Sequence, residues 1–243
     1  MKSLNYLDFK NFEFKDLSNQ VCGILSKGSG VCIIKNFPVS EDDSELVRFS
    51  KALGEPVTET RNIDGKYVYR VEVNNSLKVP TYANTSYQFL CHTDCCEFEE
   101  PPDTVILLCE KQAESGGESH VVFGEALINY FSITEFNLLS QPVFPFEGAF
   151  RPIVSLENDQ IVFRYNRVNI DFYIKAFDLN IEAKIIQVLD KLDDVMDKNK
   201  ISFILGESEC LILNNKTILH GRSSFSESSN RLMKRVRLIL NKQ

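Results

Sequence analysis

Two residues with metal-binding side chains, His92 and Asp94, lie close together in QFLCHTDCCEF, which covers residues 88–98. They are two positions apart. Residues i and i+2 of a β-strand point to the same face, whereas on a helix they point to nearly opposite sides. A histidine and a carboxylate that project together can occupy two positions of one metal ion. Two ligands do not define a metal, so the pair predicts a third ligand elsewhere in the chain.

The third ligand must come from a small set, because the chain has only three histidines. His220 ends a predicted strand in NNKTILHGRSSF and is followed closely by arginines. His120 follows the GGES turn, and we expect it to be structural. Two histidines and one carboxylate on one side of a metal form the facial triad of non-haem Fe(II) oxygenases, which leaves three coordination positions open.

The neighbouring cysteines allow two other interpretations of the same segment. Structural zinc sites usually combine two paired ligand groups such as C-x2-C, and the spacing of Cys91, Cys95 and Cys96 does not provide this pattern. A buried strand with cysteines as small apolar residues explains the thiols, but it does not explain the ionisable pair. We therefore expect the cysteines to be packing residues and zinc to be the weaker interpretation.

Three segments resemble, in order, the Fe(II)/2-oxoglutarate-dependent oxygenases of the taurine dioxygenase and clavaminate synthase-like superfamily. Residues 92–122 read HTDCCEFEEPPDTVILLCEKQAESGGESHVV, similar to the stretch from H-T-D/E through P-P to G-G-E-S/T. Residues 206–225 read GESECLILNNKTILHGRSSF, which resembles the segment with G-D/E, D-N and L-H-G-R. Residues 231–235 read RLMKR, which resembles the R-x-x-x-R that follows. The resemblance covers most of residues 80–240.

The resemblance implies roles for individual residues. The distal carboxylate of 2-oxoglutarate would pair with Arg231, eleven residues after His220, and with Ser119, where relatives often have threonine. A planar guanidinium grips a carboxylate with two parallel hydrogen bonds, which supports the choice of Arg231. The residues expected to bind iron and to be catalytic are His92, Asp94 and His220. The residues expected to contact the substrate are Arg235, Arg164, Asn166 and Gln88.

The implied reaction is hydroxylation of an unactivated C–H bond of a small molecule. The resemblance favours an amino acid or an amino-acid derivative as substrate, either free or tethered to a carrier. Fe(II) would be the metal, and 2-oxoglutarate and O2 the co-substrates, with succinate and CO2 as products. Asp94 favours hydroxylation over halogenation, because related halogenases have glycine or alanine at this position. Two alternatives stay open: desaturation, cyclisation or oxidative decarboxylation on the same fold, and a metal-binding jelly-roll protein without turnover.

The elements that must position these residues are mostly short strands. This pattern predicts a mainly β fold with flanking helices and, with the resemblance, a double-stranded β-helix (jelly roll, cupin-like) core. We expect one domain over residues 1–243, with an N-terminal extension of about residues 1–65 packed on the core.

Local patterns predict individual elements. Helices are predicted at 16–27, at 40–54 with Ser40 as the N-cap residue, and at 180–200, while QIVFRYNRV (160–168) predicts a strand.

The composition narrows the partners. With 43% hydrophobic and 25% charged residues, the 243-residue chain has an ordinary globular composition. A net charge of −7 disfavours a nucleic-acid partner. The sequence contains no stretch of 18 apolar residues, so we expect no membrane span. The seven cysteines lack the regular spacing of a disulfide framework, and the N-terminus lacks the apolar core of a signal peptide. We therefore expect reduced thiols in a cytoplasmic protein.

Overall fold

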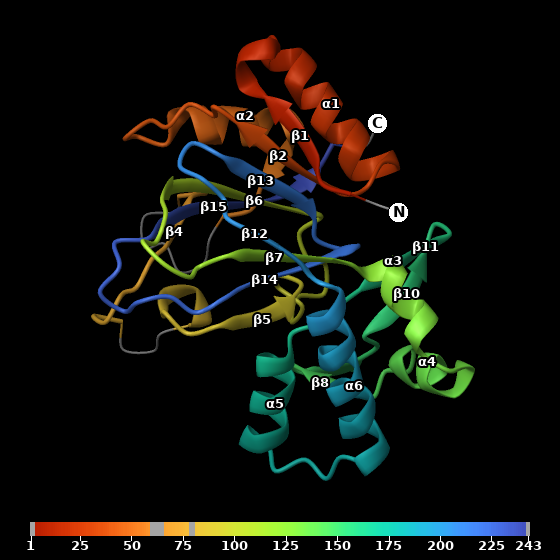
Figure 1. Ribbon diagram of the computed structural model, residues 1–243. Helices are drawn as coiled ribbons and strands as arrows, with labels where there is room; N and C mark the ends of the chain where they lie inside the picture. The colour runs from red at the N-terminus through yellow and green to blue at the C-terminus, as the bar shows by residue number, and fades with distance from the viewer. Residues whose placement is uncertain (1–2, 59–65, 78–80, 242–243) are drawn as a thin grey trace.

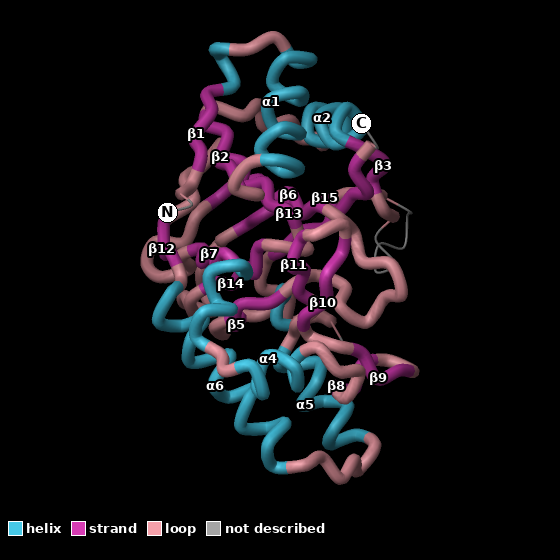
Figure 2. Tube along the Cα trace, turned by 90° about the vertical axis from the view of Figure 1, so that its right-hand side faces the viewer, coloured by secondary structure: helices cyan, strands magenta, loops and turns pink. Residues whose placement is uncertain are grey.

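The centre of the protein is a pair of facing β-sheets, and helices cover the outer side of each sheet (Figure 1). The computed structural model describes residues 3–58, 66–77 and 81–241. Seen from the side, two groups of helices lie at opposite ends of the molecule (Figure 2). The first group is α1 (Phe14–Lys27) and α2 (Ser44–Leu53), and the second includes α4 (Ile133–Leu139), α5 (Arg167–Ala176) and α6 (Ala183–Asn199). The predicted mainly β fold with flanking helices is confirmed.

The larger sheet has the strand order β1-β2-β13-β6-β15-β3, and β4 also pairs with β15. Apart from the parallel pair β1 and β2, its neighbouring strands are antiparallel. Strands from the N-terminal segment therefore share this sheet with the C-terminal strand. The strands are β1 (Asn5–Asp8), β2 (Val31–Lys35), β3 (Gly54–Pro56), β4 (Tyr69–Val71), β6 (Thr104–Lys111), β13 (Cys210–Asn214) and β15 (Leu232–Leu240).

The smaller sheet has the strand order β12-β7-β14-β5, and all its described pairings are antiparallel. Its strands are β5 (Phe89–His92), β7 (Ser119–Phe123), β12 (Ile201–Phe203) and β14 (Ile218–Arg222). At Gly221, β14 comes so close to β5 that an added Cβ would lie 2.7 Å from the carbonyl oxygen of Phe89. Glycine at this position lets the two strands approach each other.

A long segment between β7 and β12 packs on the outer side of the smaller sheet (Figure 1). Its elements, besides α4, α5 and α6, are α3 (Gly124–Leu127), η3 (Ile128–Tyr130), β8 (Phe144–Phe146), β9 (Ala149–Arg151), β10 (Val154–Glu157) and β11 (Gln160–Phe163). Two further 3-10 turns are η1 (Phe9–Asn11) and η2 (Tyr82–Asn84).

Strand alternation divides the buried side chains among three apolar cores. On β7, Val121 belongs to the core between the sheets, while Val122 belongs to the core beneath α6. On β13, Leu211 faces the space between the sheets and Ile212 faces α1 and α2. Parity along a strand therefore decides whether a side chain reaches the interior between the sheets.

The predicted helices at 16–27 and 180–200 are confirmed as α1 and α6. The helix predicted at 40–54 is α2, but Ser40 as its N-cap residue was wrong. The helix begins only at Ser44, because Asp43 occupies the N-cap position with φ of 61°.

The strand predicted over 160–168 is wrong in its second half. β11 ends at Phe163, and Asn166 caps α5 instead, because its side-chain oxygen accepts a hydrogen bond from the Asn169 backbone N–H at 3.2 Å. Asparagine at an N-cap satisfies a free helical N–H group, which overrides the alternating pattern here. Within the described part of the chain, no helix combines the length and apolarity needed to cross a membrane.

Candidate active site

Three side chains with metal-binding atoms converge between the two sheets. His92 ends β5 and His220 lies on β14, and the two residues are direct partners across this antiparallel strand pair. Asp94 follows in the turn after β5, and its Oδ1 atom is 3.2 Å from His92 Nε2 and 3.7 Å from His220 Nε2. All three residues are buried, with 4%, 4% and 7% exposure for His92, Asp94 and His220. Register and turn thus assemble the cluster that the sequence predicts.

The donor set fits a metal ion. One ligand atom from each residue lies within 4.8 Å of the others, and the described residues contain no second such group of three. Ligands bound at about 2.1 Å and at right angles lie roughly 3 Å apart, close to the observed spacing. The Nδ1 atom of His92 is 2.8 Å from the Leu90 carbonyl oxygen, which can only accept, so Nδ1 donates and Nε2 is the ring atom that faces the cluster. Burial lowers the pKa of His220 to about 3, so this imidazole is neutral at neutral pH.

The second carboxylate oxygen of Asp94 is held by arginines from the opposite sheet. Asp94 Oδ2 accepts a hydrogen bond from Arg237 Nε at 2.7 Å and lies 3.4 Å from Arg235 Nη1. Burial alone would raise the pKa of Asp94, but Arg237 and Arg235 overcome that effect and hold the pKa well below its usual range. The carboxylate is therefore ionised, with one oxygen facing the imidazoles and the other facing cations.

Hydrogen bonds also fix the backbone of the turn that carries Asp94. The Thr93 N–H donates to the Tyr165 carbonyl at 2.7 Å, and the Tyr165 N–H donates to Thr93 Oγ1 at 2.9 Å. On the other side, the Asn215 amide bonds both the N–H and the carbonyl of Asp94.

Sequence reasoning assigned no role to Asn215 or Arg237. A signal existed for each: Asn215 lies in the D-N-like motif before LHGR, and Arg237 is two positions after Arg235 on one strand face.

Arg231 forms a second charged position, immediately before β15. It is 4% exposed, its Nε donates to Gln112 Oε1 at 3.2 Å, and its guanidinium lies 5.3 Å from the Phe225 ring centroid. Among the residues that the structure describes, no carboxylate forms an ion pair with it. Burial lowers its pKa to about 10. A Cβ on Gly117, whose φ is +71°, would lie 3.1 Å from Arg231 Nε, so glycine leaves room for this side chain.

Arg222 lies near the same Phe225 ring, with 4.7 Å between its guanidinium and the ring centroid, but its contacts differ. Its Nη2 atom donates to the carbonyls of Tyr82, Thr85 and Tyr87 at 3.4, 2.8 and 2.6 Å. Arg222 therefore holds a loop, whereas Arg231 is a buried cation without a counter-charge in the part of the chain that the structure describes. The carboxylate of a ligand such as 2-oxoglutarate would supply a negative charge beside Arg231.

The other predicted site residues lie in different surroundings. Ser119 begins β7, is buried and has the strand parity of Val121, which faces the interior. Arg164 donates to the carbonyls of Cys96, Phe98 and Glu99, and Asn166 caps α5. Both side chains therefore already form hydrogen bonds to backbone groups. Their contact with substrate stays a prediction.

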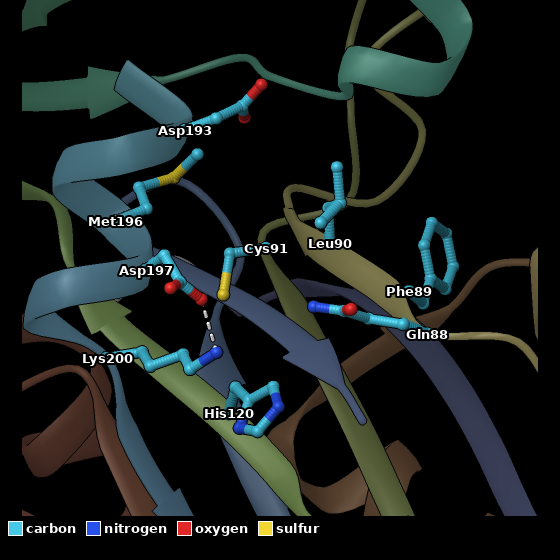
Figure 3. Close-up of a pocket in the computed structure, with 9 residues that line it drawn as sticks. All are labelled: Gln88, Phe89, Leu90, Cys91, His120, Asp193, Met196, Asp197 and Lys200. Carbon is cyan, nitrogen blue, oxygen red and sulfur yellow. Dashed lines mark hydrogen bonds and ion pairs between the residues drawn. The ribbon is translucent and has the colours of Figure 1, made fainter. Parts of the chain in front are cut away.

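Gln88 lines a pocket on the helix-covered side of β5 (Figure 3). Cys91 and His120 line the same pocket. Met196 of α6 and Lys200, directly after α6, line it from the helical side. The Nδ1 atom of His120 is 2.9 Å from Ser202 Oγ, in agreement with the structural role expected for this histidine. The role of Gln88 in binding substrate stays a prediction.

A two-sheet core that holds two histidines and one aspartate as a cluster of potential metal ligands is the arrangement typical of the class of non-haem iron oxygenases. Residues 5–237 match the family described as taurine catabolism dioxygenase TauD, TfdA family. The chain belongs to this family and is a 2-oxoglutarate-dependent dioxygenase that uses iron.

Solved structures with the same fold support this placement. An asparagine oxygenase aligns with a TM-score of 0.78 at 16% sequence identity, over 93% of this chain and 78% of that chain. The non-heme iron oxygenase OrfP, in complex with Fe and alpha-ketoglutaric acid, aligns with a TM-score of 0.73 at 15% identity, over 93% of this chain and 80% of that chain. At these identities the likeness establishes the shared jelly-roll fold. A comparison with curated proteins gives no significant match.

Proposed function

We propose that this dioxygenase hydroxylates an unactivated C–H bond of an amino acid or amino-acid derivative, with His92, Asp94 and His220 as the iron ligands. The observation that carries the proposal is the pairing of two sites in one interior. The His–Asp–His cluster offers three ligand atoms, and Arg231 offers a buried cation without a counter-charge among the described residues. An enzyme that binds iron together with a dianionic co-substrate needs both features.

Bound iron and 2-oxoglutarate supply the oxidising chemistry, in which 2-oxoglutarate loses CO2 to become succinate and oxygen enters a C–H bond of the substrate. The protein holds the reactants in place. His92 and His220 present their Nε2 atoms, and Asp94 presents Oδ1 while Arg237 holds Oδ2. The carbonyl of Leu90 keeps the proton of His92 on Nδ1.

We assign the distal carboxylate of 2-oxoglutarate to Arg231 and Ser119. Arg231 directly precedes β15, and Arg235 and Arg237 lie two residues apart on one face of that strand. Arg235 and Arg237 contact Asp94, and Arg231 has no carboxylate partner among the described residues. This arrangement supports a dianion with one end at the metal and the other at Arg231.

The substrate assignment is supported by two solved relatives and by Arg235. The asparagine oxygenase structure contains 3-hydroxyasparagine and succinate, and OrfP structures contain hydroxylated arginine. In this chain the buried guanidinium of Arg235 lies 3.4 Å from the metal-facing aspartate and 5.0 Å from the Tyr69 ring centroid. We propose that Arg235 binds the carboxylate of an amino acid, which is free or tethered to a carrier through another group.

The cofactor assignment is tested by adding Fe(II) and 2-oxoglutarate to the metal-free protein without oxygen. We expect the weak visible charge-transfer band of the iron chelate, and we expect His220→Ala to abolish it. Protein that is replete with iron but lacks the band would contradict the assignment.

The substrate is tested separately by measuring succinate release in air with a panel of free amino acids and aminoacyl thioesters. We expect one class of compound to raise succinate release above the substrate-free rate and to gain an oxygen atom by mass spectrometry. Arg235→Leu should raise KM for that compound more than KM for 2-oxoglutarate. A charge-transfer band with no stimulation by any amino acid or thioester would contradict the substrate assignment alone.

A further inference from the structure

One buried amide side chain, that of Asn215, grips the backbone of the residue that supplies the carboxylate ligand. Its Oδ1 atom accepts a hydrogen bond from the Asp94 N–H at 2.7 Å, and its Nδ2 atom donates to the Asp94 carbonyl at 2.9 Å. The second Nδ2 hydrogen goes to the Pro102 carbonyl, also at 2.9 Å. Asn215 is 1% exposed, so these three bonds form away from water. A buried amide with every donor used is held in one orientation.

The position of Asn215 in the chain connects this grip to the second histidine ligand. It lies in the turn between β13 and β14, five residues before His220. Its own backbone N–H donates to the Asp103 carbonyl at 2.8 Å, just before β6. The residue therefore joins the turn after β5, the start of β6 and the turn that leads into β14.

We propose that Asn215 is a positioning residue that fixes Asp94 relative to His220 and so keeps the metal ligands assembled before a metal binds. The direction of a side chain follows from the backbone torsion angles of its residue, and both backbone polar groups of Asp94 are bonded to Asn215. Cys95, the next residue, has φ of 55°, an uncommon backbone conformation that the surrounding contacts must maintain. This inference rests on the proposed role of His92, Asp94 and His220 as iron ligands.

The neighbouring Asn214 provides a matched control. It is the same residue type at the end of β13, directly before the turn, and its side chain also forms hydrogen bonds to backbone. Its Nδ2 donates to the Leu25 carbonyl at 3.1 Å, and its Oδ1 accepts from the Lys216 N–H at 2.9 Å. These bonds connect the turn to α1 and to itself, and none of them reaches Asp94. Loss of Asn214 therefore weakens the turn without releasing the ligand.

The test is anaerobic titration of metal-free wild type, Asn215→Ala and Asn214→Ala with Fe(II), together with melting temperatures. Groups that support metal ligands typically change metal affinity about 10- to 100-fold when removed, and we expect a loss of that size for Asn215→Ala. Co(II) is a second probe, because its visible absorption reports coordination geometry. We expect an altered Co(II) spectrum for Asn215→Ala and a wild-type spectrum and Fe(II) affinity for Asn214→Ala. Asn215→Ser, which keeps one hydroxyl, should fall between Asn215→Ala and wild type, and it replaces Asn215→Ala if that variant does not fold.

Three outcomes would overturn the inference. Asn215→Ala or Asn215→Ser with wild-type Fe(II) affinity and Co(II) spectrum would show that the ligands assemble without Asn215. An equal loss of affinity in Asn214→Ala would show that general weakening of the turn is responsible. His220→Ala identifies failure of the underlying metal assignment: if wild type binds Fe(II) no better than His220→Ala, the proposed function fails and this inference fails with it.

Discussion

The carboxylate of Asp94 and the guanidinium of Arg231 are both buried, but their charges are balanced in different ways. The carboxylate of Asp94 lies beside Arg237 at 2.7 Å and Arg235 at 3.4 Å, and it also faces the histidine ligands. The guanidinium of Arg231 has the neutral amide of Gln112 as its hydrogen-bond partner and no carboxylate among the described residues. One charge is balanced by the protein itself, whereas the other is left for a ligand to balance.

The difference has a physical consequence for the order in which the site is completed. Burying an ion without a counter-charge is unfavourable, so an anion that reaches Arg231 relieves a cost already present in the folded protein. Arg235 and Arg237, in contrast, already hold Asp94 in its ionised form. On the proposed assignment, the metal end is preorganised by protein groups, and the co-substrate completes the arginine end.

The largest expected effect follows from removing the carboxylate. Asp94→Ala deletes one of the three proposed ligands. It leaves the guanidinium groups of Arg235 and Arg237 in place, and these repel a metal cation. Because loss of a supporting group alone costs about 10- to 100-fold in metal affinity, we expect the loss of this ligand to exceed about 100-fold. Anaerobic Fe(II) titration measures it, with Asp197→Ala on α6 as a carboxylate control outside the cluster. Iron affinity close to wild type in Asp94→Ala would show that Asp94 is not a ligand.

A somewhat smaller and more selective effect is expected at the arginine end. Arg231→Leu should raise KM for 2-oxoglutarate by about 100-fold, which corresponds to roughly 2.7 kcal/mol, while Fe(II) affinity stays unchanged. Arg231→Lys should give an intermediate KM, because lysine keeps the charge but loses the planar fork. Without ligands, the melting temperature of Arg231→Leu should be no lower than that of wild type. The substitution removes a buried cation that has no carboxylate partner among the described residues. A fall in Fe(II) affinity equal to the loss for 2-oxoglutarate would remove the contrast between the two ends.

The smallest expected effect concerns the pH dependence of the metal-free protein. Burial lowers the pKa of His220 to about 3, whereas a histidine in the unfolded chain titrates near pH 6.5. Between these values the unfolded chain binds a proton at this position and the folded chain does not, so stability rises with pH. The contribution is at most about 1.4 kcal/mol per pH unit. We expect the melting temperature to fall from pH 6.5 toward pH 4, and His220→Asn to lose part of that slope. An unchanged slope in His220→Asn would contradict the assignment.

Much of the site could be predicted from residue types and spacing. The two-residue separation of His92 and Asp94 predicts that their side chains project together, and the structure brings both together with His220. The expected reason, a shared strand face, was wrong, because β5 ends at His92 and Asp94 lies in the turn that follows. Arg231 was predicted from the family resemblance, and its burial without an acid partner among the described residues agrees with binding of a carboxylate. Donor chemistry is a property of the residue type, whereas the role of Arg231 came from a resemblance that spans distant segments.

Other parts of the site could not be predicted, because they depend on contacts between distant segments. The Asp94 N–H donates to Asn215, 121 positions away, and the Asp94 carboxylate accepts from Arg237, 143 positions away. No local pattern indicates which backbone groups will meet across such distances. A similar limit applies within one segment. The alternating pattern of residues 160–168 predicts a continuous strand, but in the structure Asn166 caps a helix.

The sequence by itself determined the chemical types in the site and the mainly β character of the fold. Only the tertiary structure decided that His220 lies opposite His92, that Asp94 is shared between imidazoles and arginines, and that Arg231 is buried without an acid partner among the described residues. The reason is that strand register, burial and charge environment arise from the packing of whole sheets against each other. A residue's type and its nearest neighbours in the chain do not specify that packing.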